Sequence, residues 1–411
     1  MSPQPPASAP HHPAPAPVED VAVGAIWTPI ARDPAAPGAA IRFYTTPRHN
    51  RRRVTLIGER FDLRPPCAEA ATAVILATVL ANRLQADLRL ITRSDAVEPT
   101  RIDQLLQLHG LALRGESILQ WVPTQGADVE LDRFDDELVL AASCESAAAA
   151  LAAAPLRDVV CLLQSDERLL QAQVVERMRC QALLQRQDLR FVVNSQSLKA
   201  WLIEQGLPHF GTSALVFEPA YPLRASHAGP HVQTGPRRLL FHAPARGSSA
   251  LFARGLAAIE QALSLGLLDP QRWAFSFIGR GLPEVALAGW QRPQQLQDTD
   301  ADAYARLLGE TDLALVLGAP GSTSGNAMEI AASGAVVVSN TFLKATSEAL
   351  ADSHGFAGRT VACGDETASM LQGLQQGAAR LAADAVKAQA PIRRDWTQAL
   401  QGVVETLAVG R

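Results

Sequence analysis

The stretch TDLALVLGAPGSTSGNAMEIAASGAVVVSN at residues 311–340 decides the fold. Its apolar run at 312–317 predicts a buried strand, and a loop of small residues follows it. The run 326–332 predicts a short helix that stops at Gly334, after which 335–340 predicts a second apolar strand. Two apolar strands joined by a helix indicate a βαβ unit in a parallel sheet that is covered on both faces.

The same alternation of strands and helices extends over most of the chain. In the first half we expect strands at 53–58, 87–92, 118–123, 137–143, 158–164 and 190–194, with helices at 68–84, 145–153 and 168–186. In the second half we expect further strands at 238–242, 274–279 and 359–363, with helices at 249–265 and 300–308. This pattern predicts two doubly wound α/β halves whose ligands bind at the carboxyl ends of the strands.

Breaks in the pattern predict the domain boundaries. Residues 1–22 are rich in Pro and Ala and predict a disordered leader, and 219–236 is a Pro/Gly-rich linker. The first Rossmann-like domain then covers 23–218, and the second covers 237–390. A helical pattern at 391–411 is compatible with a helix that crosses back to the first domain or with a simple terminal helix.

Composition excludes several functional classes. The formal net charge of −4 gives no basic field for nucleic acid, and no apolar run is long enough to span a membrane. The leader lacks the apolar stretch of a secretory signal, so we expect a cytoplasmic protein. Five scattered cysteines without a CxxC pair argue against a disulfide framework and a zinc site, and we expect no metal.

The loop at 318–325 is the best candidate for a ligand site. A loop of small residues that opens a helix presents free backbone N–H groups and the positive end of the helix dipole, which suits a diphosphate. Glu329, one turn into that helix, can accept hydrogen bonds from the ribose hydroxyls of the same ligand. The alternative is that any βαβ crossover needs such a loop, and an acidic first turn is common capping chemistry.

Five stretches carry a resemblance to a known family. They are PGSTSGNAMEIAASGAVVVSNTF (320–342), LLFHAPARGSSALFARGLAAIEQALSLGLLDPQRWAFSFIGRGLP (239–283), DAYARLLGETDLALVLG (302–318), VVCLLQSDER (159–168) and FVVNSQSLKAWLIEQGL (191–207). Their order resembles family-four GT-B glycosyltransferases, and more closely the rhamnosyltransferase branch that builds rhamnose-containing surface polysaccharides. The resemblance implies an α/β GT-B fold, in which the parallel sheets of two Rossmann-like domains face a central cleft.

The resemblance also implies roles for individual residues. Glu329 matches the ribose-binding glutamate, and residues 322–326 match the diphosphate-contacting turn. The donor-binding candidates are Arg246, Arg280, Ser322, Thr323, Ser324, Gly325, Asn326 and Glu329. The candidates that face the cleft from the first domain, on the acceptor side, are Gln164, Asp166, Glu167 and Asn194. Glu329, Asp166 and His242 are the catalytic candidates, although a strand-end histidine such as His242 is more often a structural residue. Tyr304 is expected to pack rather than to contact the ligand.

Three positions depart from the family pattern. Gly321 stands where many members have a second glutamate, Pro244 where the branch has a phosphate-neutralising arginine, and Gln297 where it has a lysine. A diphosphate needs cationic partners, and the nearby candidates to replace them are Arg246, Arg280 and Lys344.

The expected function is transfer of a sugar, rhamnose by the closer resemblance, from a nucleoside diphosphate sugar such as dTDP-rhamnose to a surface glycan or glycolipid. The reaction would need neither metal nor cofactor, and the bacterial enzyme would act in the cytoplasm or at the inner membrane face as a homo- or hetero-oligomer. The run RHNRRR at 48–53 could contact anionic lipid there or be a solvated basic edge. The alternatives are a catalytically degenerate GT-B scaffold or regulatory subunit that binds a nucleotide or glycan, and a sugar-nucleotide epimerase.

Overall fold

The computed structural model describes residues 40–47, 52–63, 67–94, 96, 98–124, 128–221, 235–242, 249–279, 282–287, 292–296, 299–318, 325–341, 358–383 and 395–409. All of them belong to one compact unit of the chain, Gly38–Arg411. The predicted leader at 1–22 and most of the predicted linker at 219–236 lie outside these residues.

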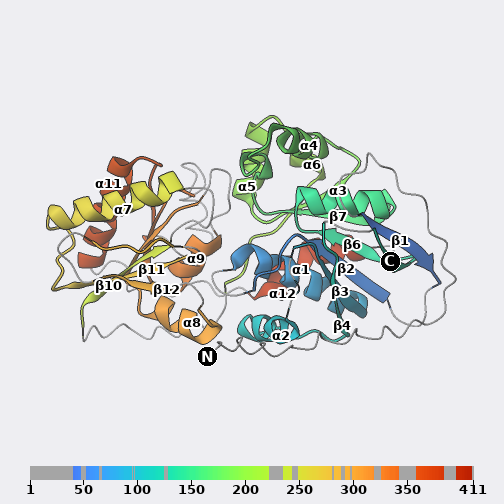
Figure 1. Cartoon of the computed structure of the whole chain (residues 1–411), viewed down its shortest axis with the longest axis horizontal. Helices are drawn as coiled ribbons and strands as arrows, with labels where there is room; N and C mark the ends of the chain where they lie inside the picture. The colour runs from blue at the N-terminus through green and yellow to red at the C-terminus, as the bar shows by residue number, and fades with distance from the viewer. Residues whose placement is uncertain are drawn as a thin grey trace, which may run out of the picture. The chain divides into compact units, whose positions relative to one another are not determined.

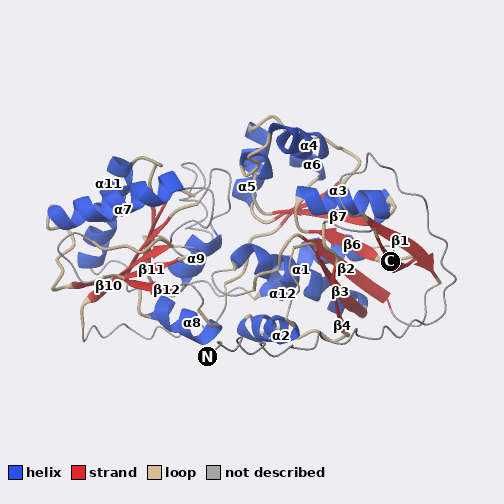
Figure 2. Cartoon of the chain, viewed as in Figure 1, coloured by secondary structure: helices blue, strands red, loops and turns tan. Residues whose placement is uncertain are grey.

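The first half contains a seven-stranded parallel sheet, as Figure 2 shows in red. Its strands, in spatial order, are β4 (Ser117–Trp121), β3 (Ala86–Thr92), β2 (Arg52–Gly58), β6 (Leu138–Ala141), β7 (Val159–Leu163), β8 (Arg190–Val193) and β9 (Leu215–Val216). Such strands are parallel and apolar because helices cover both faces of the sheet.

The helices of the first half divide between those two faces. They are α1 (Ala68–Leu84), α2 (Pro99–Leu108), α3 (Cys144–Ala153), α4 (Val174–Leu184), α5 (Gln196–Glu204) and α6 (Phe210–Ser213), with short 3-10 turns η1 (Leu156–Asp158) and η2 (Glu167–Leu169). One core joins α1 and α2 to the sheet, and a second core joins α3, α4, α5 and α6 to its other face. The long helix expected at 168–186 is shorter, because 167–169 form the turn η2 and α4 begins at Val174.

The second half contains a six-stranded parallel sheet. Its spatial order is β12 (Gln294–Leu296), β11 (Trp273–Ile278), β10 (Arg237–His242), β13 (Leu313–Val316), β14 (Val336–Ser339) and β15 (Thr360–Ala362). Its helices are α7 (Ser249–Ser264), α8 (Ala301–Gly309), α9 (Gly325–Ala332) and α11 (Thr367–Ala382). The predicted α/β fold with parallel sheets is confirmed, and the βαβ unit of 311–340 is β13–α9–β14.

The last helix, α12 (Trp396–Ala408), packs against the first half rather than the second. Its buried residues Leu400, Val403, Val404 and Leu407 belong to the core that contains α1. The indole Nε1 of Trp396 donates a hydrogen bond to Nδ1 of His109 at 2.9 Å, just beyond the end of α2. The chain thus returns to its first half, and the red helix α12 lies among the blue elements in Figure 1.

A two-stranded parallel sheet, β1 (Ile41–Thr46) with β5 (Val129–Phe134), was not predicted. Behind it lies a buried ion network in which Arg53 and Arg89 both donate to Glu137, at 2.7 and 2.5 Å. The side chains of Arg89 and Glu137 are fully buried. The prediction that the run 48–53 is a solvated basic edge or a lipid contact is therefore wrong for Arg53, which is buried. Residues 48–51 lie outside the described residues.

In the described part of the chain, no helix is long and apolar enough to cross a membrane.

Candidate functional site

Residues of both halves line one pocket that holds about 570 Å³ of empty space, part of it open to solvent. The first half contributes the start of α1, the end of α2 and the residue after β8, and the second half contributes α8 and the start of α9. The lining residues are Cys67, Ala68, Ala71, Thr72, Leu105, Leu108, His109, Asn194, Pro219, Ala220, Tyr221, Tyr304, Gly325, Glu329 and Trp396. Such a pocket, apolar with a few converging polar groups, is typical of a small-molecule site.

Glu329 is the carboxylate that the second half brings to this pocket. It lies one turn into α9, and its side chain is half-buried. Within the described residues, the only hydrogen-bond partner of its carboxylate is the Tyr304 hydroxyl, which donates to Oε2 at 3.1 Å. Burial raises the pKa of Glu329 to about 7, and the hydrogen bond from Tyr304 opposes that rise. A carboxylate with one protein partner retains acceptor capacity for a ligand.

Tyr304 has a larger part in the site than the sequence indicated. It is buried on α8, as packing requires, but its hydroxyl reaches Glu329 and its side chain lines the pocket. Ser333, just beyond α9, has its Oγ 2.7 Å from the carbonyl of Ile330 in α9 and 3.1 Å from the carbonyl of Leu308 on α8. Its single hydroxyl hydrogen can donate to either carbonyl, and the contact with Leu308 links the end of α9 to α8.

The position at which the chain leaves β13 toward this site is fixed by hydrogen bonds. Asn340, after β14, accepts from the N–H of Gly318 and donates to its carbonyl, both at 2.9 Å. The loop that follows, 319–324, lies outside the described residues, as do 243–248 and 280–281. The proposed donor contacts Ser322, Thr323, Ser324, Arg246 and Arg280 therefore cannot be placed, and neither can Gly321, Pro244, Gln297 or Lys344.

The remaining donor candidates are described. Gly325 begins α9 and lines the pocket. Asn326 follows it, and its side-chain Oδ1 is buried without a hydrogen-bond partner among the described residues. A buried polar atom without a partner costs free energy unless a ligand or water satisfies it.

His242 ends β10 and is buried, and neither Nδ1 nor Nε2 has a partner within the described part of the chain. Burial lowers the pKa of its imidazole to about 4, so the ring is neutral near pH 7. A neutral ring has one donor and one acceptor to offer. The structure places His242 at the strand end that the sequence indicated, although it is not one of the residues that line the pocket.

On the acceptor side, Asn194 is the predicted residue that reaches the pocket. Its Nδ2 donates to Oε1 of Gln164 at 3.1 Å, and Gln164 in turn donates to the carbonyl of Glu69 at 2.8 Å. The Oδ1 of Asn194 has no partner among the described residues. Gln164 therefore positions Asn194, and Asn194 presents a free acceptor.

Asp166 does not have the geometry of a catalytic carboxylate. Its side chain is 1% exposed, and both oxygens accept hydrogen bonds from Arg168, at 2.8 and 2.7 Å. The indole of Trp201 donates to Oδ2 as well, at 3.0 Å. The ion pair also caps the turn η2, which gives this aspartate a structural role, and its arrangement does not support the catalytic role expected for it.

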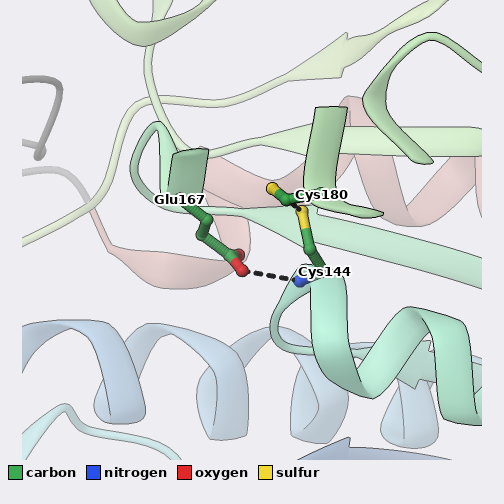
Figure 3. Close-up of side chains that lie close together, drawn as sticks. All are labelled: Cys144, Glu167 and Cys180. Carbon is green, nitrogen blue, oxygen red and sulfur yellow. Dashed lines mark hydrogen bonds between the residues drawn. The ribbon is translucent and has the colours of Figure 1, made fainter. Parts of the chain in front are cut away.

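Glu167, the fourth acceptor-side candidate, is also turned inward. It accepts a hydrogen bond from the backbone N–H of Cys144 at 2.7 Å, and burial raises the pKa of its carboxyl to about 7. With Cys144 and Cys180 it forms a group of donor atoms that all lie within 4.8 Å of one another, where a metal ion could be held (Figure 3).

Several pocket residues were not predicted as site residues. His109 and Trp396 come from sequence positions 287 residues apart and meet through their hydrogen bond. Burial lowers the pKa of His109 to about 4. Because its Nδ1 accepts from the indole, the neutral ring carries its proton on Nε2. The sequence contains no local signal that would bring these two residues together.

The fold agrees with that of solved glycosyltransferases. The chain is similar to WaaG, a glycosyltransferase involved in lipopolysaccharide biosynthesis, with a TM-score of 0.58 at 12% identity over 87% of this chain and 100% of that one. It is also similar to Anabaena HepE in complex with UDP and glucose, with a TM-score of 0.56 at 14% identity over 87% and 99% of the two chains. The trehalose-6-phosphate synthase OtsA gives a TM-score of 0.53 at 12% identity over 86% and 98%. The two parallel sheets thus form a GT-B fold.

A family model matches most of the second half. Residues 237–359 match the model described as "WsaF, C-terminal domain", which covers the chain from the start of β10 to the residue before β15. No curated protein matches the sequence. The expected class, a glycosyltransferase of the GT-B type, agrees with these findings.

Proposed function

We propose that this protein transfers a sugar from a nucleoside diphosphate sugar to a glycan acceptor, with Glu329 as the residue that binds the ribose of the donor. The observation that carries the proposal is the half-buried Glu329 carboxylate, which lines the pocket and has Tyr304 as its only partner within the described residues. Ribose hydroxyls are donors of the kind that this carboxylate lacks.

The surroundings of Glu329 suit the rest of such a ligand. The N-terminus of α9, at Gly325, also lines the pocket, and a helix N-terminus favours a diphosphate. Asn326 and His242 add buried polar atoms that have no partner among the described residues, and we assign them to the diphosphate and the sugar. Arg246 and Arg280 would supply the positive charge that the diphosphate requires.

On the opposite side, Asn194, Thr72 and His109 are the polar groups available to an acceptor. Their amide, hydroxyl and imidazole groups suit the hydroxyls of a glycan. Positioning of donor and acceptor, and stabilisation of the leaving diphosphate, supply most of the rate acceleration in such a transfer. A pocket lined by both halves suits this requirement because it can hold the two substrates side by side.

The proposed sugar is rhamnose, with dTDP-rhamnose as the donor and no resident cofactor. The resemblance to the rhamnosyltransferase branch motivates this choice, and the match to the WsaF C-terminal domain, at residues 237–359, covers much of the same part of the chain. A surface glycan or its lipid-linked precursor is the proposed acceptor, reached from the cytoplasmic face of the membrane.

The test is donor binding by the full chain, measured by calorimetry against dTDP, UDP and GDP sugars. We expect Glu329→Gln to weaken binding of the preferred donor at least about tenfold, because one pair of charge-assisted hydrogen bonds is lost. Asp302→Asn is the matched control, since it removes an exposed carboxylate from α8 and should leave the affinity unchanged.

Two outcomes would count against the proposal. If no nucleotide sugar binds, or if Glu329→Gln binds as the wild type does, the nucleotide site is misplaced. If the donor binds but no rhamnan-type acceptor is extended and the donor is not hydrolysed, the protein is a GT-B scaffold that retains only binding.

A further inference from the structure

Three of the five cysteines meet in the core of the first half, away from the proposed site. Cys144 begins α3, Cys161 lies in β7 and Cys180 lies in α4, and all three belong to the same hydrophobic core. The sequence separates Cys144 and Cys180 by 36 residues, so no short motif indicates the pair. Neither thiol has a part in the function proposed above.

The thiols of Cys144 and Cys180 are in unusually close contact. Their Sγ atoms are 3.0 Å apart, and the two side chains point toward each other in Figure 3. Both residues are nearly inaccessible, with 5% and 4% of their surfaces exposed. The contact with Cys180 and burial raise the pKa of the Cys144 thiol well above its usual range.

Glu167 completes the group as a nearby proton acceptor. Its carboxylate is held at the start of α3 by the backbone N–H of Cys144, and one of its oxygens lies within 4.8 Å of both sulfurs. The charges next to it are Glu69 of α1 and Glu145 of α3, and both raise its pKa further. Glu167 therefore lies where it can take the Cys144 proton as the sulfur is oxidised.

We propose that Cys144 and Cys180 form a reversible disulfide when the protein meets a small peroxide, with Glu167 positioned to take the proton of Cys144. The oxidant has to be small because both thiols are buried. This is a modification site of the first half and does not depend on the proposed transferase activity.

The chemistry balances with hydrogen peroxide as the oxidant. The Cys144 sulfur gives its proton to Glu167 and attacks one peroxide oxygen, the O–O bond breaks, and the leaving hydroxide takes the proton to become water. Cys180 then attacks the sulfenic sulfur of Cys144, so that the S–S bond forms and a second water leaves. Overall, the two thiols lose two protons and two electrons, and one peroxide becomes two waters.

A metal ion is the other possible occupant of this group, and the geometry favours it less. Two thiolates on a tetrahedral zinc, each about 2.3 Å from the ion, keep their sulfurs about 3.8 Å apart, which is farther than the 3.0 Å observed. Cys144, Glu167 and Cys180 also provide three ligands, whereas structural zinc sites take four.

Peptide mapping of the wild-type chain tests the proposal directly. Trypsin cuts after Arg133, Arg157, Arg168, Arg179 and Arg186, which places Cys144 in peptide 134–157, Cys161 in 158–168 and Cys180 in 180–186. The reduced protein is exposed to hydrogen peroxide, alkylated in denaturant and digested without reductant. We expect 134–157 joined to 180–186 and lighter by two hydrogens, 158–168 alkylated, and the link broken by dithiothreitol.

Variants separate this pair from other thiol chemistry. Cys161→Ala should still form the link, whereas Cys144→Ala and Cys180→Ala should not. Glu167→Gln should slow its formation about tenfold and remove the rise in rate that the wild type shows through about pH 7, and Glu176→Gln, exposed on α4, should change neither. The second readout matters because a merely structural glutamate would not set a pH profile.

The proposal is overturned if peroxide-treated wild type carries Cys144 and Cys180 as separate alkylated peptides, or joined to other cysteines. It is also overturned if the purified chain holds one equivalent of zinc, measured by mass spectrometry of the metal, that resists peroxide. Neither result bears on nucleotide binding by Glu329, so the two proposals fail independently.

Discussion

The carboxyl ends of the two sheets carry similar polar residues but use them differently. In the first half, Asp166 accepts hydrogen bonds from Arg168 and Trp201. Gln164 accepts from Asn194 and donates to the backbone carbonyl of Glu69. In the second half, Glu329 has a single partner within the described residues, and His242 has none. Polar groups that satisfy one another hold a fold together, whereas those without partners are available to a ligand.

The difference suggests that the first half is the more fixed of the two walls of the pocket. Its strongest polar feature is the buried pairing of Arg53 and Arg89 with Glu137, which ties β2 and β3 to the residue before β6. No comparable buried ion network occurs among the described residues of the second sheet. The four predictions below test this contrast, beginning with the largest expected effect.

Glu137→Ala should lower the free energy of unfolding by about 3–5 kcal/mol, because it leaves two buried guanidinium groups without their shared carboxylate. Guanidinium chloride unfolding at pH 7 measures the loss. Asp135→Ala is the control, since Asp135 is exposed in the same turn and should cost little. A loss below about 1 kcal/mol for Glu137→Ala would show that the network contributes little to the first half.

Asp166→Asn should lower the free energy of unfolding by about 2–3 kcal/mol and leave the affinity for a nucleotide sugar unchanged. The amide can no longer accept both hydrogen bonds of the Arg168 guanidinium. Parallel unfolding and calorimetric titration test both parts. The contrast between the two sheets breaks down if affinity falls while stability is retained, because Asp166 would then be a ligand residue after all.

Glu329→Gln should stabilise the ligand-free protein relative to the wild type at pH 8 but not at pH 4.5. The folded pKa is raised from 4.5 to about 7, so the wild type's protonated form contributes stability below pH 4.5 that is lost as the pH rises through about 7. The expected difference is on the order of 2 kcal/mol after allowance for the partial exposure of the side chain.

Thermal unfolding of the wild type and Glu329→Gln across this range measures the difference. Glu59 and Glu167, whose pKa values are also raised to about 7, titrate in both proteins and cancel in the comparison. A pH-independent gap between the two curves would mean that Glu329 is an ordinary solvated carboxylate.

Tyr304→Phe should have the smallest effect, a loss of about 1 kcal/mol in stability at pH 8, because one hydrogen bond to a carboxylate is removed. The same change should move the pKa of Glu329 further upward, which infrared titration of the carboxyl would show. Tyr44→Phe is the control, since that side chain is exposed on β1. An unmoved pKa would place the hydroxyl outside the environment of Glu329.

Local sequence patterns predicted most of the strands and helices because apolar periodicity is a local property. The unit β13–α9–β14 and the position of Glu329 on its helix follow directly from residues 311–340. The pairing of β1 with β5 did not follow, since their registered residues, such as Ile41 and Val129, lie 88 positions apart, and only one residue of β1 and two residues of β5 are buried. The strand β12 was missed because its three residues, Gln294–Leu296, are mostly polar.

In the candidate site too, the position of a side chain on its element followed from local sequence, whereas its hydrogen-bond partners did not. The sequence predicted His242 and Asn194 at the ends of strands and Glu329 one turn into a helix, and the structure has His242 at the end of β10, Asn194 directly after β8 and Glu329 in α9. It could not predict that Arg168 would form a buried ion pair with Asp166 and that Trp201 would donate to it, because an aspartate before an arginine has the same local appearance whether or not it is buried. The meeting of Cys144 with Cys180, and of His109 with Trp396, likewise required the packing of helices that are distant in sequence.

The sequence by itself determined two α/β halves and the helix that carries Glu329, because strand and helix periodicities are written in consecutive residues. Only the tertiary structure decided which polar groups are satisfied and which are left to a ligand. Whether a carboxylate serves the fold or the site depends on neighbours that arrive from elsewhere in the chain. In this protein those neighbours occupy Asp166 and leave Glu329 open to the pocket.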